Sequence, residues 1–108
     1  MILPLNLTKV LLILLRKVKL EKTFDIQEDS NECTAVAKVK NKGKNLAFMV
    51  HLAVTKGEDG DELTPVYWDD NYFSLFPGEI KEIKVRFSKK DLGDKSAVLK
   101  VDGWNVDL

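Results

Sequence analysis

One alternating stretch decides the fold of this chain: Cys33-Thr34-Ala35-Val36-Ala37-Lys38-Val39. Its odd-numbered positions are small or apolar, and the polar residues Thr34 and Lys38 stand between them. A period of two places successive side chains on opposite faces of a β-strand. The stretch therefore predicts a strand with one face turned toward a core.

Turn-forming residues bound this strand, and similar strands lie on either side of it. Polar residues 27–31 separate it from an earlier strand, on which Val18, Leu20, Phe24 and Ile26 share one face. Later strands are expected at residues 46–54, 63–67, 72–76, 83–87 and 97–101, with one helical turn near residues 89–92. So many short strands in about a hundred residues predict an all-β fold: an immunoglobulin-like antiparallel β-sandwich of about seven strands.

The segment 46–54 is apolar on both faces of its expected strand. Leu46, Phe48, Val50, Leu52 and Val54 fall on one face, and Ala47, Met49 and Ala53 on the other. This pattern is typical of a central strand, or of a strand covered by another domain. His51 is interpreted as a packed or domain-facing histidine, because no acid or nucleophile can be placed beside it.

Composition excludes several functional classes. The chain has 17 basic and 17 acidic residues, so its charge gives no reason to bind nucleic acid or an acidic membrane. The one cysteine, Cys33, is expected to be a small buried residue, and it does not fix the cellular compartment. With His51 it cannot supply the four ligands of a zinc site. We therefore expect no metal and no cofactor.

The first 16 residues are expected to lie outside the sandwich, which is assigned to residues 17–108. Residues 10–15 are continuously apolar, but this is far shorter than the roughly 20 residues that cross a bilayer. No membrane span is expected. The segment is interpreted as an apolar strand or as a linker remnant left from an upstream domain, with a degenerate export signal as the alternative.

Catalysis by this chain is not expected. Glycoside hydrolysis, for example, needs two carboxylates roughly 5–10 Å apart across a cleft. The acidic residues here stand mostly in turns beside lysines, which is typical of a solvated surface. The chain also lacks the short motifs of nucleotide-binding and hydrolytic sites.

An aromatic stretch, residues 65–79, is the strongest candidate for binding. It places five aromatic rings around a polar triplet and then reaches a Pro77-Gly78 turn, where Pro and Gly suit a type II turn. The candidate sugar or interdomain contacts are Tyr67, Trp68, Asp69, Asp70, Asn71, Tyr72 and Trp104. In the competing interpretation the Asp and Asn side chains hold a tight turn, and the rings, with Trp104, cover the end of the core. A calcium site at residues 69–71 is not supported, because six or more oxygens are needed.

These motifs resemble those of a known module. Val50-His51-Leu52, the run from Pro65 to Leu75, Pro77-Gly78-Glu79 and Asp102-Gly103-Trp104-Asn105 occur in this order in the C-terminal, immunoglobulin-like domain of family 2 glycoside hydrolases of the β-mannosidase and exo-β-glucosaminidase type. Many members carry Ser where this chain has Asp69. The resemblance covers the chain from about Lys17 onward.

The resemblance implies a non-catalytic accessory domain. The parent would be a retaining exo-glycosidase, often periplasmic or secreted in bacteria, whose two catalytic glutamates belong to a separate (β/α)₈ barrel. Its other domains are the expected partners, and the chain alone is expected to be monomeric. Two rival functions remain: an independent carbohydrate-binding module, and a protein-interaction module that works by edge-strand pairing.

Overall fold

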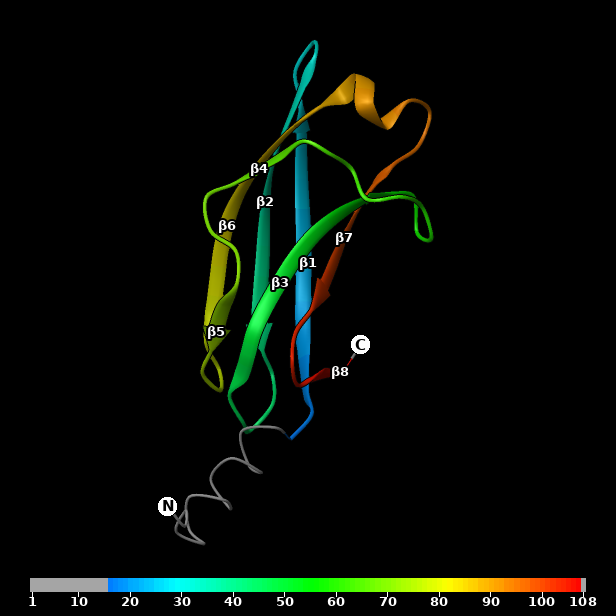
Figure 1. Ribbon diagram of the computed structural model, residues 1–108. Coiled ribbons are helices and arrows are strands. Elements are labelled where there is room, and N and C mark those ends of the chain that lie inside the picture. The colour runs from blue at the N-terminus through cyan, green and yellow to red at the C-terminus, as the bar shows by residue number, and fades with distance from the viewer. Residues whose placement is uncertain (1–15, 108) are drawn as a thin grey trace, which may run out of the picture.

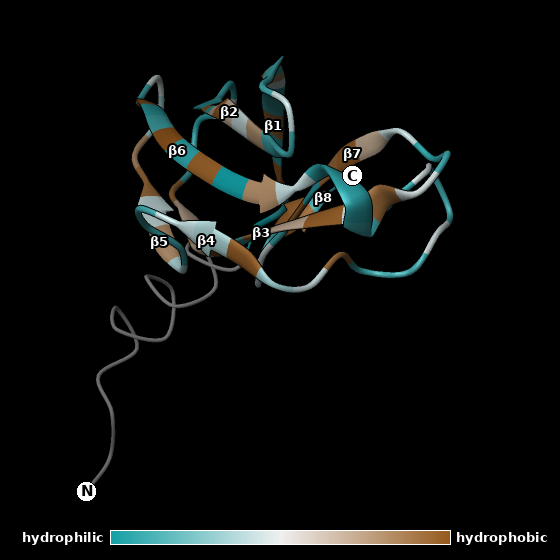
Figure 2. Cartoon of the chain, turned by 90° about the horizontal axis from the view of Figure 1, so that it is seen from above, coloured by the Kyte–Doolittle hydropathy of each residue, from teal (hydrophilic) through white to brown (hydrophobic). Residues whose placement is uncertain are grey.

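The alternating residues 33–39 lie in strand β2 (Glu32–Asn41), the middle strand of a five-stranded sheet with the order β4-β6-β2-β1-β8. A three-stranded sheet, β5-β3-β7, packs against it to form a sandwich in this computed structural model, which describes residues 16–107 (Figures 1 and 2). The other strands are β1 (Val18–Glu28), β3 (Ala47–Lys56), β4 (Val66–Trp68), β5 (Phe73–Leu75), β6 (Ile80–Ser88), β7 (Ala97–Asp102) and β8 (Val106–Asp107).

The predicted all-β sandwich is confirmed, and the seven expected strands are all present. The predicted helical turn is a 3-10 turn, η1 (Lys89–Leu92). At Pro77-Gly78 the amide of Glu79 donates to the carbonyl of Phe76 at 3.0 Å, and Gly78 has φ 80°, as a type II turn requires. The additional strand is β8, which pairs in parallel with β1 through Val18 and Val106.

The core lies between the two sheets. Its largest fully buried apolar side chains are Phe87, Leu52, Leu63, Leu75 and Ile83. The inward positions of β2 are small and buried: Cys33, Ala35, Ala37 and Val39. Cys33 is fully buried, as expected, and burial raises the pKa of its thiol. The thiol is therefore a packing group at neutral pH rather than a nucleophile.

The predicted central strand 46–54 is confirmed as β3, in the middle of its sheet, but its predicted faces were partly wrong. Ala47 and Val50 are both buried, and the register with β5 shifts between them. Met49 has φ 52° at this β-bulge. A bulge inserts one extra residue and changes which face each side chain takes. Phe48 is consequently on the outer face, not on the core face with Val50.

The β1–β2 hairpin extends beyond the other strands, as Figure 1 shows at its upper end. Ile26 lies on this extension and is exposed, so the apolar face expected for the first strand is covered only at Val18 and, in part, at Leu20 and Phe24. Lys22 shares the same face of β1. Its Nζ donates to the carbonyl of Leu99 in β7, at the edge of the second sheet, at 2.7 Å.

Two fully buried asparagines connect strands through their side-chain amides. Asn41 donates to the carbonyls of Asn45 and Leu75 at 2.8 and 2.9 Å and accepts from the amide of Gly43. The side chain of Asn105 likewise bonds to the backbone of Arg16, Leu46 and Phe48, near the starts of β1 and β3. Within residues 16–107 the structure has no helix long and apolar enough to cross a membrane.

Candidate functional site

Exposed aromatic side chains gather on the outer face of the three-stranded sheet. We call this surface the aromatic face; it comprises Phe48, Met49, His51, Tyr72 and Trp104. Met49, Tyr72 and Trp104 are 41%, 63% and 70% exposed. The rings of His51 and Tyr72 stack with centroids 4.6 Å apart, and those of Phe48 and Trp104 lie 6.5 Å apart. Exposed aromatic side chains gathered on one sheet face make this surface a candidate interaction site.

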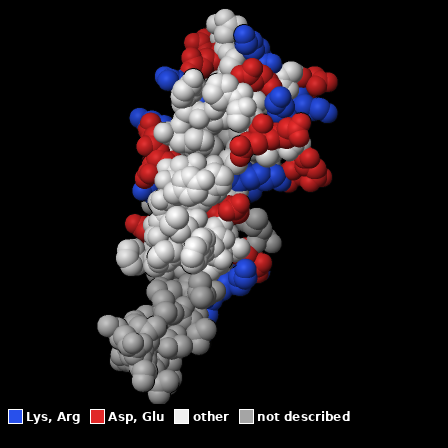
Figure 3. Space-filling model, in the orientation of Figure 1, with Lys and Arg blue, Asp and Glu red and all other residues white. Residues whose placement is uncertain are grey.

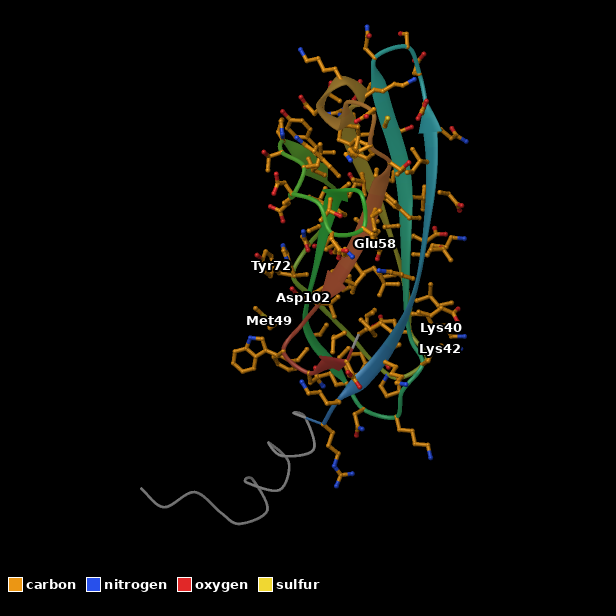
Figure 4. All side chains as sticks on the ribbon, turned by 90° about the vertical axis from the view of Figure 1, so that its right-hand side faces the viewer. Lys40, Lys42, Met49, Glu58, Tyr72 and Asp102 are labelled. Atoms are coloured by element: carbon orange, nitrogen blue, oxygen red, sulfur yellow. The ribbon has the colours of Figure 1, made fainter. Side chains whose placement is uncertain are left out.

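The aromatic face carries little charge. In the orientation of Figure 1, uncharged atoms form a continuous band over the middle of the molecule, and acidic and basic groups lie along its edges and above it (Figure 3). Figure 4 shows Met49 and Tyr72 on one side of the sandwich and Lys40 and Lys42 on the opposite side. Interfaces exclude charge at their centres in the same way and favour aromatic residues and methionine.

Backbone contacts present Trp104 to solvent. Its amide donates to the carbonyl of Phe48 at 3.1 Å, which brings the β7–β8 turn onto the bulge of β3. Gly103 makes this approach feasible, because a Cβ there would lie 3.1 Å from the carbonyl oxygen of Phe48 and 2.8 Å from Cγ2 of Val106. One interpretation of the sequence placed Trp104 over the end of the core. This was wrong, because its side chain is 70% exposed.

Asn105 fixes the same turn from inside. Its Oδ1 accepts from the amide of Phe48 at 2.8 Å, and its Nδ2 donates to the carbonyls of Arg16 and Leu46 at 2.9 and 2.6 Å. Its own carbonyl accepts from the amide of Val18 at 2.7 Å. One buried residue thus ties the β7–β8 turn to the starts of β1 and β3.

Tyr72 is held by its neighbour Asn71. The Oδ1 of Asn71 accepts from the amides of Leu52 and Tyr72, both at 2.9 Å, and its Nδ2 donates to the carbonyl of Leu52 at 3.0 Å. The side chain therefore pairs with β3 as a strand residue would. Tyr72 has φ 57°, a conformation that non-glycine residues seldom adopt, and its ring is thereby turned over His51.

Asp70 serves the same loop. Its Oδ1 accepts from the amide of Asn71 at 2.8 Å, and its Oδ2 lies 2.7 Å from Nζ of Lys81. The hydrogen bond from Lys81 holds the pKa of the Asp70 carboxyl below its usual range. These contacts favour the turn-holding interpretation for Asp70 and Asn71.

The Asp70–Lys81 pair predicts a pH-dependent contribution to stability. The lowered pKa means that the contribution is present above the unfolded carboxyl pKa of about 4 and is lost as pH falls through the folded value. We expect Lys81→Gln to raise the Asp70 pKa in an NMR carboxyl titration, and to reduce stability slightly at pH 7 but not near pH 2. Lys84→Gln is the control, since Lys84 forms no ion pair in the described residues. An unchanged Asp70 pKa in Lys81→Gln would contradict the assignment.

The remaining predicted site residues are divided between the faces of the sandwich. Trp68 points inward and packs against the core. Tyr67 lies on the outer face of the five-stranded sheet, 59% exposed, with the guanidinium of Arg86 over its ring at 5.4 Å. Asp69 is exposed beside it, with its amide bound to the carbonyl of Lys84. Of the seven predicted contacts, only Tyr72 and Trp104 therefore present side chains on the aromatic face.

Three members of the aromatic face were not among the predicted contacts. Phe48 and Met49 were missed because the bulge that turns them outward leaves no mark in the alternating pattern. His51 was expected to be packed or domain-facing, and it lies on this face. Asp102 stands opposite His51 in the β3–β7 register, so the expectation that no acid would lie beside it was wrong; no ion pair joins the two within residues 16–107.

The described residues, 16–107, contain no group of side chains that could hold a metal ion. A hollow of about 120 Å³ lies beside His51 and Asn71, well below the size of small-molecule sites. The aromatic face is therefore an open surface and not an enclosing pocket.

Comparison with known proteins identifies the family. The sequence model described as the exo-beta-D-glucosaminidase Ig-fold domain matches residues 10–106. The chain belongs to this family. The match begins before residue 17, where the sequence analysis placed the start of the sandwich.

Curated relatives support this assignment of the Ig-fold domain. The exo-beta-D-glucosaminidase of Arthroderma benhamiae is 34% identical over 89 residues, which cover 82% of this chain and 10% of that protein. The exo-beta-D-glucosaminidase of Streptomyces avermitilis is 36% identical over 77 residues, 68% of this chain and 8% of that protein. A mannosylglycoprotein endo-beta-mannosidase of Lilium longiflorum is 41% identical over 58 residues, covering 48% of this chain and 6% of that protein.

A solved structure shows the same fold. The exo-chitosanase of Amycolatopsis orientalis matches 84% of this chain with a TM-score of 0.78 and 26% identity, and the match covers 11% of that enzyme. The chain thus spans about a tenth of the length of its relatives. It belongs to a family of immunoglobulin-like accessory domains that form a small part of larger glycosidases, as the resemblance implied.

Proposed function

We propose that this domain docks through its aromatic face onto the other domains of a glycoside hydrolase that releases glucosamine from β-glucosaminides. The proposal rests on the exposed aromatic rings, which lie on a part of the sheet face that carries little charge. Buried Trp and Tyr side chains supply much of the binding energy at protein interfaces. In this domain a backbone contact at the β3 bulge holds Trp104 outward, and a contact with Asn71 holds Tyr72 outward.

The substrate class follows from the relatives. Two of those described above are named exo-beta-D-glucosaminidases, and the solved relative is an exo-chitosanase. The Lilium enzyme acts on a mannosylglycoprotein by its name, so a β-mannoside is the second candidate. The division into residues 1–16 and a domain at 17–108 is kept as part of this proposal, with the apolar segment as the connection to the preceding part of the parent.

The hydrolytic residues belong elsewhere in the parent. Glycoside hydrolysis needs two carboxyls that face each other across a cleft sized for the sugar. The acids that line the hollow on the outer face of the five-stranded sheet, Asp25, Asp69 and Glu82, are all exposed on an open surface. We therefore expect the purified chain not to release p-nitrophenol from p-nitrophenyl β-D-glucosaminide or the matching β-mannoside.

A domain exchange tests the docking. Residues 16–107 would replace the corresponding domain of the Amycolatopsis orientalis exo-chitosanase, chosen because the two folds superpose with a TM-score of 0.78. We expect the chimera to hydrolyse chitosan. Trp104→Ala and Tyr72→Ala should each weaken association of the separately expressed domain with the rest of that enzyme by about tenfold or more.

Tyr67→Ala is the matched control, because Tyr67 is an equally exposed ring on the opposite face. It should associate like the unchanged domain. The docking proposal fails if the folded Trp104 and Tyr72 variants associate normally, or if Tyr67→Ala is the variant that dissociates.

A further inference from the structure

A polar groove occupies the outer face of the five-stranded sheet, opposite the aromatic face. Its volume is about 890 Å³, within the range of ligand sites. Outward-facing side chains of β1, β2 and β6 form its floor, and Tyr67 and Asp69 from the β4 edge form one side. The docking of the aromatic face onto the parent would leave this groove free.

The strand registers arrange the groove in rows. Gln27, Thr34, Arg86 and Tyr67 stand in one row, and Asp25, Val36 and Lys84 in the next. The amide of Asp69 donates to the carbonyl of Lys84, which places Asp69 at the end of the second row. An exposed ring thus borders a floor with hydrogen-bond donors, acceptors and one half-buried apolar side chain, Val36.

Charges in the groove are only partly compensated. Lys38 pairs with Glu82 at 3.1 Å, and Arg86 pairs with Glu32 at 3.0 Å. Within residues 16–107 neither Asp25 nor Asp69 forms an ion pair. The groove therefore offers carboxylates at two sides to a ligand cation, and Lys84 between them to a hydroxyl oxygen.

We propose that this groove binds an oligosaccharide of β-linked glucosamine. Tyr67 would stack on the apolar face of one sugar ring through the ring face that the guanidinium of Arg86 leaves open. Asp25 and Asp69 bind the ammonium groups, and Lys84 and Gln27 bind hydroxyls. Choosing glucosamine among sugars rests on the proposed function, whereas the groove itself does not.

The dimensions suit a short stretch of polysaccharide. At about 4.8 Å between strands, the floor from β4 to β1 is about 14 Å wide, and from Thr34 to Lys38 it is about 13 Å long, enough for about two or three pyranose rings. The groove is open, so the ligand is an internal or terminal segment of a chain that continues beyond the domain.

An NMR titration of the full chain tests the proposal, using the tetramer of β-1,4-linked glucosamine, its fully N-acetylated counterpart and a mannose tetramer. We expect saturable amide shifts at residues 25, 34–36, 67–69 and 84 with the glucosamine tetramer. The N-acetylated tetramer, which lacks the cation, and the mannose tetramer should bind about tenfold more weakly. Rising salt should weaken glucosamine binding.

Variants separate the groove from the aromatic face. Tyr67→Ala should weaken binding of the glucosamine tetramer about tenfold, and Asp25→Asn and Asp69→Asn should remove its preference over the N-acetylated tetramer. Tyr72→Ala, on the aromatic face, should bind like the unchanged chain. The proposal is overturned if the groove residues do not shift, if Tyr67→Ala binds normally, or if all three sugars bind equally.

The two proposals fail separately. If the domain associates with the rest of the enzyme but does not bind sugar, only the groove proposal is rejected. If the groove binds glucosamine but the domain does not associate, only the docking proposal is rejected.

Discussion

Replacement of Asn105 by alanine is expected to lower the free energy of unfolding by about 3–4 kcal/mol, because it leaves several backbone groups without partners at once. The side chain is fully buried and serves the amide of Phe48 and the carbonyls of Arg16 and Leu46. Each buried group left unpaired costs about 1–3 kcal/mol, and only part of that loss is recovered through water. Chemical denaturation monitored by far-UV circular dichroism measures the change.

Asn45→Ala is the matched control for this prediction. Asn45 is half-buried in the loop before β3, and its contact with Asn41 uses its backbone carbonyl, which the substitution leaves in place. The control should change stability by less than about 0.5 kcal/mol. Equal losses in the two variants would show that Asn105 does not hold the β7–β8 turn to β1 and β3.

Gly103→Val is expected to lower the free energy of unfolding by about 3 kcal/mol and to displace Trp104. The first added carbon alone would lie 3.1 Å from the carbonyl oxygen of Phe48 and 2.8 Å from Val106. Since Phe48 O belongs to the backbone, the turn must move away from β3 rather than rearrange a side chain. Trp104 fluorescence should therefore shift together with the denaturation midpoint.

Gly78→Asn provides the comparison for Gly103. Gly78 has φ 80°, but nothing lies within 4 Å of an added Cβ, and asparagine tolerates this region of backbone space. Its cost should stay below about 1 kcal/mol. If Gly103→Val proves as mild as Gly78→Asn, the close approach to Phe48 is not what requires glycine.

The predicted sandwich follows from the sequence because strand period and turn chemistry are local signals. The alternation in β2 and the Pro77-Gly78 turn are both readable without knowledge of distant residues. The sequence did not show which side chains of β3 point toward the core. A bulge depends on how β3 pairs with β5 across a gap in register, and its residues, Ala47 to Val50, are all apolar.

Of the five residues of the aromatic face, only Tyr72 and Trp104 were predicted as contacts, for a related reason. The run from Tyr67 to Tyr72 is one cluster in the sequence, but in the structure it crosses from one sheet to the other. Tyr67 therefore faces the groove, Trp68 the core, and Tyr72 the aromatic face. Asn105 follows Trp104 directly in the sequence, so the two look like one surface motif. In the structure Asn105 is buried and Trp104 is exposed.

The contact from Lys22 to Leu99 has a consequence for the solution behaviour of the domain. An open edge strand such as β7 is the place where copies of a β protein can add to one another and grow into fibrils. Here the ammonium group of Lys22 lies at the edge. An incoming chain would have to displace water from this group and approach its positive charge. The Lys22 ammonium therefore opposes the pairing of a second copy of the chain at the β7 edge.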